Sequence, residues 1–579
     1  MEAEAFAFIN DGVEGEDEDD REDRAGGDED SESVDYEFEN CLDAASLLQL
    51  NNNDPALTEL NVRFGRYQFA NRVDWKSENY FDGIGNNTHL KTLYLYYDND
   101  GDYEYEDADS DDDSPTIDEI SQAIGDFCRY LATNRSIEHL SYTCPFEMEP
   151  LTVFIENNDN LRHLVITEFI TDSSLILASS LSNRKNKSSL ESVSFRNILC
   201  EMSCEFLSEL IASLGGYHNL VQLDLSGSCL GREASIALRR LIKQPNMKLE
   251  ELNLSNIPIH NECAAILADG FAKSKTLKKL NFSGQDSVVG FGLGVEGIIA
   301  LADVLANSVT IKSVDLRNNH LVTSIGWCRF FHCLRNSETV VEELNLGGNT
   351  ITYEGAAALT AAFSNSDKLN TLILPVDQLN STRGWQAVAD LLLPSCFSAL
   401  EVFEVQCNYD EVRAITTFAN ALVNNTSLKT LLMDHGQEGM SPTTERALAV
   451  MANTLCNTSS INATYASNHT LETFSYSPHN SDIASALLLN KNKNKLEVAH
   501  HKILNHHFMQ TEGVANLNVF IDMDLKVLPH AIAWVGMCRD SMGLSVLHKI
   551  LSSLPPLLKS EKKVRFEVKM RPLHKKPKL

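Results

Sequence analysis

The sequence has few basic residues for its size. Its 579 residues include 48 lysines and arginines against 81 aspartates and glutamates, which gives a formal net charge of −33. Attraction between basic side chains and phosphates supplies most of the affinity in non-specific nucleic-acid binding. The acidic balance therefore argues against nucleic acid as a partner, and it favours solubility.

Long apolar runs and paired cysteines are also missing. No apolar stretch approaches the about 18 residues that a membrane-spanning helix needs, and no signal peptide is expected at the start. The 13 cysteines form no C-x-x-C pair, which indicates reduced, buried thiols in a reducing compartment. We expect a cytoplasmic protein without membrane contact. A nuclear location is the alternative, because 574–578 (HKKPK) resembles a short nuclear-localisation signal.

No group of residues has the pattern of a catalytic site. The glycine-rich stretch 290–294 lacks the lysine of a phosphate-binding loop, and four histidines between 500 and 507 lack the cysteine or carboxylate frame of a metal site. Asp98–Glu106 carries oxygen ligands at alternate positions, as a calcium loop does, but Tyr103 stands where that loop needs glycine. We predict no enzyme, no metal site and no cofactor.

A short apolar phrase, L-x-x-L-x-L, recurs along most of the chain. Leu249–Leu254 (LEELNL) shows it clearly, and most copies start 24 to 34 residues apart. In a strand this spacing places the leucines on one face. One strand per repeat predicts a parallel stack. The first apolar residues of the copies are Leu57, Leu90, Ile137, Leu161, Leu190, Leu220, Leu249, Leu277, Ile311, Val341, Leu369, Leu400, Leu428 and Leu471.

An alanine-rich stretch with helical spacing follows each phrase. Residues 232–243, 261–272 and 354–363 place their apolar side chains on one face, so each should cover the outer side of the sheet. Two copies extend the phrase to a later asparagine, Asn319 and Asn349. A buried asparagine there would bond backbone groups that leave the sheet, so both are interpreted as structural.

The extended phrase L-x-x-L-x-L-x-x-N-x-L, with its period near 29 residues and alanine-rich helix, resembles the ribonuclease-inhibitor class of leucine-rich repeats. That class includes ribonuclease inhibitor, the Ran GTPase-activating protein and the repeat regions of NOD-like receptors. The resemblance is strong over 190–434 and weaker over 57–189 and 471–476. It implies an α/β solenoid shaped as a horseshoe, with a parallel sheet on its concave face and outer helices.

Composition divides the chain into four parts. Residues 1–35 hold 16 acidic and 2 basic side chains and are predicted to be a disordered acidic tail. The repeat solenoid covers 36–480, with an opening helix at 36–56 as its N-terminal cap and an acidic insertion at 97–116. A helical C-terminal cap follows at 481–558, because the last apolar edge of an array needs cover. Residues 559–579 form a basic tail.

The outward positions of the strands are the candidate binding residues. Asp224, Asn253, Asn281, Asp315 and Asn345 should form the middle row on the concave face, joined by Arg317, Glu343 and Glu404. Tyr94 and Tyr96 near the start, and Ile373 and Leu432 further along, would be apolar anchors if the register is right. A register shifted by one residue would bury them instead.

We expect a non-enzymatic scaffold or adaptor that binds a protein partner on the concave face. The acidic balance favours a basic partner. Two alternatives follow from the resemblance: a regulator of a small GTPase, and a sensor module of the NOD-receptor kind. A third role, purely structural, would show as self-assembly.

Overall fold

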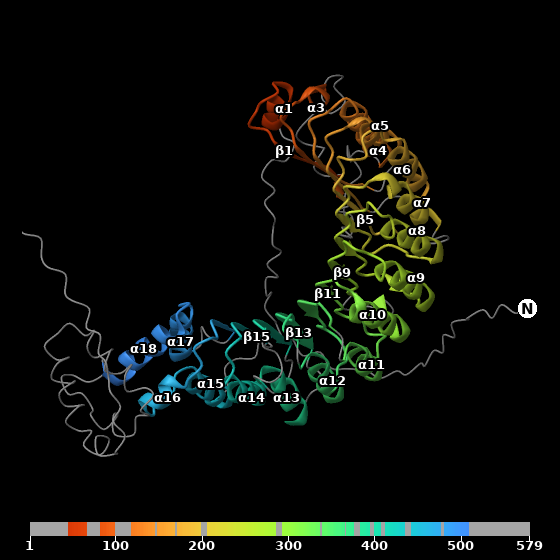
Figure 1. Ribbon diagram of the computed structural model, residues 1–579. Helices are drawn as coiled ribbons and strands as arrows, with labels where there is room; N and C mark the ends of the chain where they lie inside the picture. The colour runs from red at the N-terminus through yellow and green to blue at the C-terminus, as the bar shows by residue number, and fades with distance from the viewer. Residues whose placement is uncertain are drawn as a thin grey trace, which may run out of the picture.

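The computed structural model describes residues 44–65, 82–98, 117–144, 148–167, 171–198, 205–284, 292–335, 338–364, 366–375, 382–393, 399–406, 411–434, 442–475 and 480–508. These residues form a curved solenoid in which strands line the inner side of the arc and helices the outer side (Figure 1). The predicted fold class, an α/β solenoid with a parallel concave sheet, is confirmed.

The described residues form one parallel sheet of 14 strands, whose order in space is their order in the sequence. Two further short strands lie outside this sheet. Its strands are β1 (Glu59–Gly65), β2 (Thr92–Asp98), β3 (His139–Thr143), β4 (His163–Thr167), β5 (Ser192–Arg196), β6 (Gln222–Asp224), β7 (Glu251–Asn253), β9 (Lys279–Asn281), β11 (Ser313–Asp315), β12 (Glu343–Asn345), β13 (Thr371–Pro375), β14 (Val402–Gln406), β15 (Thr430–Asp434) and β16 (Thr473–Phe474). The two short strands, β8 (Pro258–Ile259) and β10 (Gly292–Leu293), pair with each other.

Helices follow the strands and pack side by side on the outer face (Figure 1). They are α1 (Ala44–Asn51), α3 (Asp82–Asn86), α4 (Ile117–Leu131), α5 (Glu149–Asn157), α6 (Thr171–Asn183), α7 (Glu205–Ser213), α8 (Arg232–Ile242), α9 (Asn261–Phe271), α10 (Val295–Asn307), α11 (Ser324–Leu334), α12 (Tyr353–Phe363), α13 (Thr382–Ala389), α14 (Glu411–Leu422), α15 (Pro442–Leu455), α16 (Ile461–Tyr465), α17 (Ser481–Asn490) and α18 (Lys495–Ile503). The 3-10 turns η1 (Leu214–Gly216) and η2 (Asp390–Leu392) and the π-helical turn η4 (Leu504–Phe508) complete the set.

The predicted repeats agree with the strands one for one. Every strand of the long sheet starts two residues after the first apolar residue of a repeat, as β7 does after Leu249. The predicted helices 232–243, 261–272 and 354–363 appear as α8, α9 and α12. The glycine-rich stretch 290–294, which lacks the lysine of a phosphate-binding loop, contributes Gly292 and Leu293 to β10, which pairs with β8.

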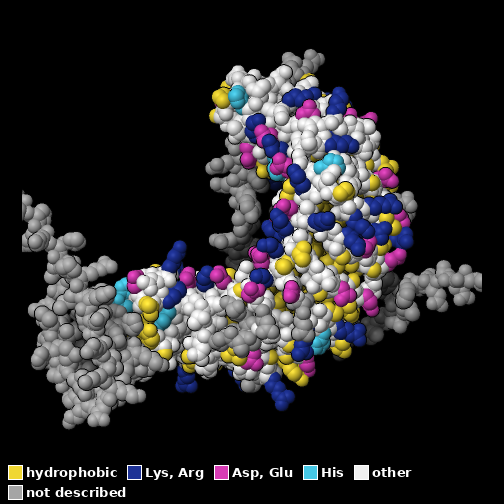
Figure 2. Space-filling model, in the orientation of Figure 1, with side chains coloured by type: hydrophobic (Ala, Val, Ile, Leu, Met, Phe, Trp, Pro, Cys, Tyr) yellow, Lys and Arg dark blue, Asp and Glu magenta, His cyan; other side chains and the backbone are white. Residues whose placement is uncertain are grey.

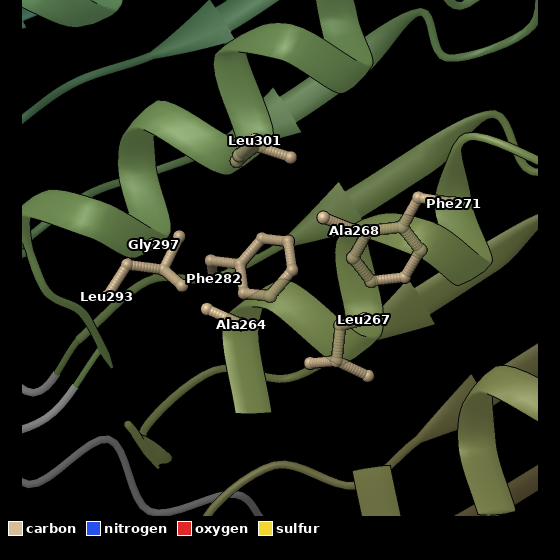
Figure 3. A pocket seen from close by; sticks show the side chains of 8 residues that line it. All are labelled: Ala264, Leu267, Ala268, Phe271, Phe282, Leu293, Gly297 and Leu301. Atoms are coloured by element: carbon tan, nitrogen blue, oxygen red, sulfur yellow. The ribbon is translucent and has the colours of Figure 1, made fainter. Parts of the chain in front are cut away.

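The core is the apolar space between the sheet and the helices. Leu252 and Leu254 are almost fully buried, as the alternation predicts. Between α9 and α10 the packing leaves a small apolar cavity, with the Phe271 and Phe282 rings edge to face at 5.8 Å (Figure 3). Its lining residues are Ala264, Leu267, Ala268, Phe271, Phe282, Leu293, Gly297 and Leu301. Its lining is apolar and small in extent, which is typical of a packing defect rather than of a ligand site.

The two helices α17 and α18 close the C-terminal end of the described solenoid (Figure 1). Lys502 of α18 is fully buried, and its Nζ donates to the carbonyl oxygens of Leu455 (2.6 Å) and Asn468 (2.9 Å). His469 Nδ1 lies 3.3 Å from the same ammonium group. The long side chain thus ties α18 to the end of α15 and to the last loop before β16.

Several predictions fall on residues that the structure does not describe. The tail 1–35, most of the acidic insertion with its calcium-like stretch, the cap beyond residue 508 and the basic tail all lie outside the described residues. The predicted opening helix 36–56 is shorter in its described part, where α1 covers Ala44–Asn51. The predicted limits of the four parts therefore stay predictions.

Candidate functional site

The concave face of the sheet consists of the side chains that point away from the core. In β7, Leu252 is buried while Glu251 and Asn253 on either side are half-exposed. Because all strands are parallel, equivalent residues line up across the sheet. We call the row that contains Glu251 the first lane and the row that contains Asn253 the middle lane.

Pairing between neighbouring strands fixes both lanes. The first lane reads Glu59, Thr92, His139, His163, Ser192, Gln222, Glu251, Lys279, Ser313, Glu343, Thr371, Val402, Thr430 and Thr473. The middle lane reads Asn61, Tyr94, Ser141, Val165, Ser194, Asp224, Asn253, Asn281, Asp315, Asn345, Ile373, Glu404 and Leu432. The structure therefore brings the predicted residues of the middle row onto one face.

Five middle-lane side chains have a structural task at the end of their strand. Oδ1 of each accepts the backbone N–H two residues later: Asp224 from Ser226, Asn253 from Ser255, Asn281 from Ser283, Asp315 from Arg317 and Asn345 from Gly347, at 2.9 to 3.1 Å. Such turns satisfy a donor that leaves the sheet ladder. Aspartate and asparagine therefore recur in this lane because each stabilises the turn at the end of its own strand.

Most charges on the central concave face are neutralised by neighbours. Asp224 forms an ion pair with Arg196 (2.8 Å), Glu251 with Lys279 (2.9 Å), and Asp315 with Arg317 of its own turn (2.9 Å). Glu343 and Glu404 differ, because neither forms an ion pair or a side-chain hydrogen bond with any residue in the described ranges. Among the predicted site residues, these two carboxylates are the ones without an ion-pair partner there, although Lys279 lies near enough for its charge to act on Glu343.

An aromatic cluster occupies the N-terminal part of the concave face. The rings of Tyr94 and His139 lie 5.6 Å apart, and those of His139 and His163 stack at 5.5 Å. Burial lowers the pKa of His139, and the nearby His163 lowers it further, which favours the neutral imidazole. All three side chains are half-exposed. Tyr94 therefore faces the hollow as expected, and the alternative of a shifted register does not hold for it.

An aliphatic cluster occupies the other end of the same face. Ile373 and Leu432 flank Glu404 in the middle lane, and Val402 stands beside them in the first lane. The three aliphatic side chains are half-exposed rather than buried. The register predicted for Ile373 and Leu432 is therefore the observed one, and the face changes from paired charges to apolar contacts along the arc.

A rim of ion pairs along the edge of the sheet was missed from the sequence. It joins residues that follow the first apolar residue of successive repeats: Lys91 with Glu138 (2.9 Å), and Arg162 with Glu138 (3.6 Å) and Glu191 (2.7 Å). Hydrogen bonding from Lys91 lowers the pKa of the Glu138 carboxyl. Basic and acidic side chains accordingly alternate along the inner rim (Figure 2). A charged residue directly after the first apolar residue of most repeats was the signal in the sequence.

A second missed feature is a row of buried asparagines before the strands. Asn468 accepts N–H groups from Thr470 and Leu471 through Oδ1, and its Nδ2 donates to the carbonyls of Leu422 (2.8 Å) and Asn425 (3.0 Å). Asn87, Asn134, Asn158 and Asn425 make similar bonds. Asn134, Asn425 and Asn468 each begin an Asn-x-Ser/Thr triplet and accept the N–H of its third residue, so these three triplets have a structural role in the loops.

The two asparagines that extend the repeated phrase bind each other's loops after the strands. Asn319 Nδ2 donates to the carbonyls of Leu316 (2.8 Å) and Phe282 (3.0 Å), and its backbone N–H donates to Asn349 Oδ1 (2.8 Å). Both asparagines are buried. In these two copies the leucines of the phrase pack in the core, and the asparagine bonds backbone groups of its own loop and of a neighbouring repeat. Both asparagines are thus structural, as predicted.

The chain is a leucine-rich-repeat protein. This conclusion rests on the repeated phrase, on the strand that each copy forms and on the asparagines that join successive copies.

Comparison with known proteins gives partial matches to other repeat proteins. No family model matches the chain. The human NACHT, LRR and PYD domains-containing protein 12 is 25% identical over 188 residues, which is 32% of this chain and 17% of that protein. The match therefore spans a small part of the relative.

Solved structures resemble the leucine-rich-repeat chain distantly. A yeast Rad7–Elc1 complex structure has 16% identity and a TM-score of 0.36, covering 64% of this chain and 87% of that chain. A Listeria monocytogenes internalin has 13% identity and a TM-score of 0.26, covering 72% and 87%. A leucine-rich-repeat protein of Bacteroides eggerthii has 14% identity and a TM-score of 0.27, covering 61% and 56%.

The described part of this leucine-rich-repeat chain contains neither a candidate metal site nor a candidate membrane-spanning helix. No group of three or more histidine, cysteine, aspartate or glutamate side chains there could hold a metal ion. No helix in that part has the length and apolar character that crossing a bilayer requires. His507, one of the four clustered histidines, contacts the Thr464 hydroxyl at 2.7 Å and is half-buried, so it packs against α16 rather than facing solvent.

Proposed function

We propose that this leucine-rich-repeat chain is a non-enzymatic scaffold or adaptor of the ribonuclease-inhibitor-like class, and that it binds a protein partner on its concave face. One observation carries the proposal: side chains from successive strands, most of them exposed or half-exposed, form two lanes on a preformed sheet, with only Asn61 and Ser194 of the middle lane buried. A rigid surface of this kind loses little conformational entropy on binding. Solenoids commonly use their concave side in this way.

The lanes also support a proposal about the chemistry of the partner. Tyr94, His139 and His163 offer an aromatic contact at one end, and large half-buried side chains are the residues that most often anchor an interface. Glu343 and Glu404 leave unpaired negative charge toward the other end. A basic protein partner fits this pattern, and attraction to it would speed association at low salt.

Charge reversal at these two carboxylates is the test. The double variant Glu343→Lys and Glu404→Lys changes the face without removing a hydrogen bond, whereas Asp224 and Asp315 support turns and would confuse binding with folding. Glu445→Lys on the exposed side of α15 is the matched control. Tagged full-length proteins are compared for partners retained from cell lysate at low and at moderate salt.

The proposal predicts a discrete partner that the double variant loses and the Glu445 control keeps. The same partners on all three proteins would place binding elsewhere. A profile of self-association alone would support the purely structural role instead.

A further inference from the structure

The middle lane changes its character after β12. From β6 to β12 it carries aspartate or asparagine, and each of these residues supports the turn after its own strand, as Asn345 does through the N–H of Gly347. The next three strands carry Ile373, Glu404 and Leu432 at the same position. All three side chains are half-exposed. They therefore face the hollow without the turn-supporting bond that explains the earlier residues.

These three side chains stand in one row across the strands. Neighbouring strands lie about 4.8 Å apart, so Ile373 and Leu432 are separated by roughly 10 Å, with Glu404 between them. The Glu404 carboxylate has no ion pair or side-chain hydrogen bond with a residue in the described ranges. Val402 adds a half-exposed aliphatic side chain in the first lane of the same strand. The row thus offers two apolar contacts with one negative charge midway.

An α-helix that lies across the strands matches this spacing. The helix rises about 1.5 Å per residue, so its residues i and i+7 lie about 10.5 Å apart on one face, with i+3 and i+4 between them. An extended segment places side chains on one face only about every 6.6 Å, which is out of step with the strands. On a helix, moreover, apolar residues at i and i+7 and a basic residue between them share one face.

The face also offers side chains but no backbone groups. The central strand β14 pairs with β13 on one side and with β15 on the other, so its backbone N–H and C=O groups bond to those strands. A segment that lies on this face therefore receives no backbone hydrogen bonds from it. A helix makes these bonds internally, whereas an extended segment would leave its own groups unpaired along the contact.

We propose that the partner presents an amphipathic α-helix, which lies across β13 to β15 on the concave face. Its apolar residues i and i+7 contact Ile373 and Leu432, and a lysine or arginine at i+3 or i+4 pairs with Glu404. Charge complementarity selects the basic residue, because an acidic one would be repelled there. This inference rests on the proposed function and deepens it, since it specifies the part of a protein partner that the face binds.

Selection from two displayed peptide libraries tests the inference on the full-length protein. One library randomises one face of a monomeric helical scaffold, and the other holds short peptides without structure. We expect ligands from the helical library, with apolar residues seven positions apart and a basic residue three or four positions after the first. Their affinity should fall roughly tenfold for Ile373→Thr and for Leu432→Thr, and stay unchanged for the control Glu445→Lys on exposed α15.

An exchange of charges separates direct contact from an effect on folding. The variant Glu404→Lys should lose the selected helical ligands. A ligand whose central basic residue is changed to glutamate should bind Glu404→Lys better than it binds the wild-type protein. Such recovery requires that the variant is folded and that the two positions are in contact.

The two libraries distinguish failure of the helix from failure of the surface. Ligands from the unstructured library alone, with affinity that still depends on Glu404, would overturn the helix and leave binding on the concave face in place. Ligands that bind Ile373→Thr, Leu432→Thr and Glu404→Lys as well as the wild type, or no ligand from either library, would also overturn the inference. The lysate comparison with Glu343→Lys and Glu404→Lys decides the proposed function separately.

Discussion

Replacing Asn349 with alanine should loosen the joint between two repeats. The buried Asn349 side chain donates from Nδ2 to the carbonyls of Leu316 (2.7 Å) and Leu346 (2.8 Å), and its Oδ1 accepts the N–H of Asn319 (2.8 Å). These three backbone groups have left the sheet ladder. Asn349→Ala therefore leaves all three without this partner in a place that water reaches poorly.

The expected loss follows from these three bonds. A typical intramolecular hydrogen bond contributes about 1 kcal/mol net, so the variant should lose about 3 kcal/mol of local stability. Asn345→Ala is a matched control in the same repeat, because half-exposed Asn345 makes one such bond, to the N–H of Gly347 at 3.1 Å. That change should cost about 1 kcal/mol.

Hydrogen exchange is the suitable assay for this comparison. Long repeat arrays need not unfold in one step, so a single global free energy can mislead. Local opening free energies are read directly from exchange rates of peptides that cover β11 and β12. A loss of about 3 kcal/mol corresponds to exchange faster by about two orders of magnitude. If Asn349→Ala accelerates exchange no more than Asn345→Ala does, the structural role of the asparagine row is wrong.

Three further predictions concern other parts of the chain. Gly348 has φ = 66°, and a Cβ there would come within 1.6 Å of Asn318 Oδ1, so Gly348→Ala should lower the denaturation midpoint, with a cost above about 1 kcal/mol. Burial lowers the pKa of Lys502 to about 7 and that of His469 to about 4, so the folded state holds fewer protons than the unfolded chain from about pH 10.5 down to 4. The free energy of opening α18 should therefore fall on acidification, which hydrogen exchange would show as faster exchange of α18. Lys502→Met should remove the pH dependence of this free energy above about pH 7, because that range belongs to the titration of Lys502. Burial raises the pKa of Cys128 to about 12, so alkylation at pH 8 should be slow in the native protein and fast in denaturant; equal rates would contradict its burial.

The repeats could be found from the sequence because their signal is local and repeated. Each phrase, such as Leu249–Leu254, carries its own strand pattern, and the structure places a strand at every predicted copy. The middle lane could also be aligned, since parallel strands of equal register bring Asp224, Asn253 and Asn281 side by side. Periodicity alone was sufficient for both.

Contacts between side chains of different repeats could not be found in this way. Whether Asp224 is open or paired depends on Arg196 of the preceding strand, 28 residues away, and on the rotamer that the arginine adopts. Glu404, which resembles Asp224 as an acidic middle-lane residue, has no such neighbour in the described residues. Buried Lys502 gave no signal either, because its two carbonyl partners come from loops that only the fold brings together.

The most direct test of the account places a photo-activated cross-linking residue on each side of the solenoid. One variant carries it at Thr371, between Glu343 and Val402 in the first lane of the concave face, and another at exposed Glu445 on α15. The account predicts that light joins a protein partner to position 371 and not to position 445. Partner capture from position 445 alone would show that the outer helices, and not the concave sheet, form the binding surface.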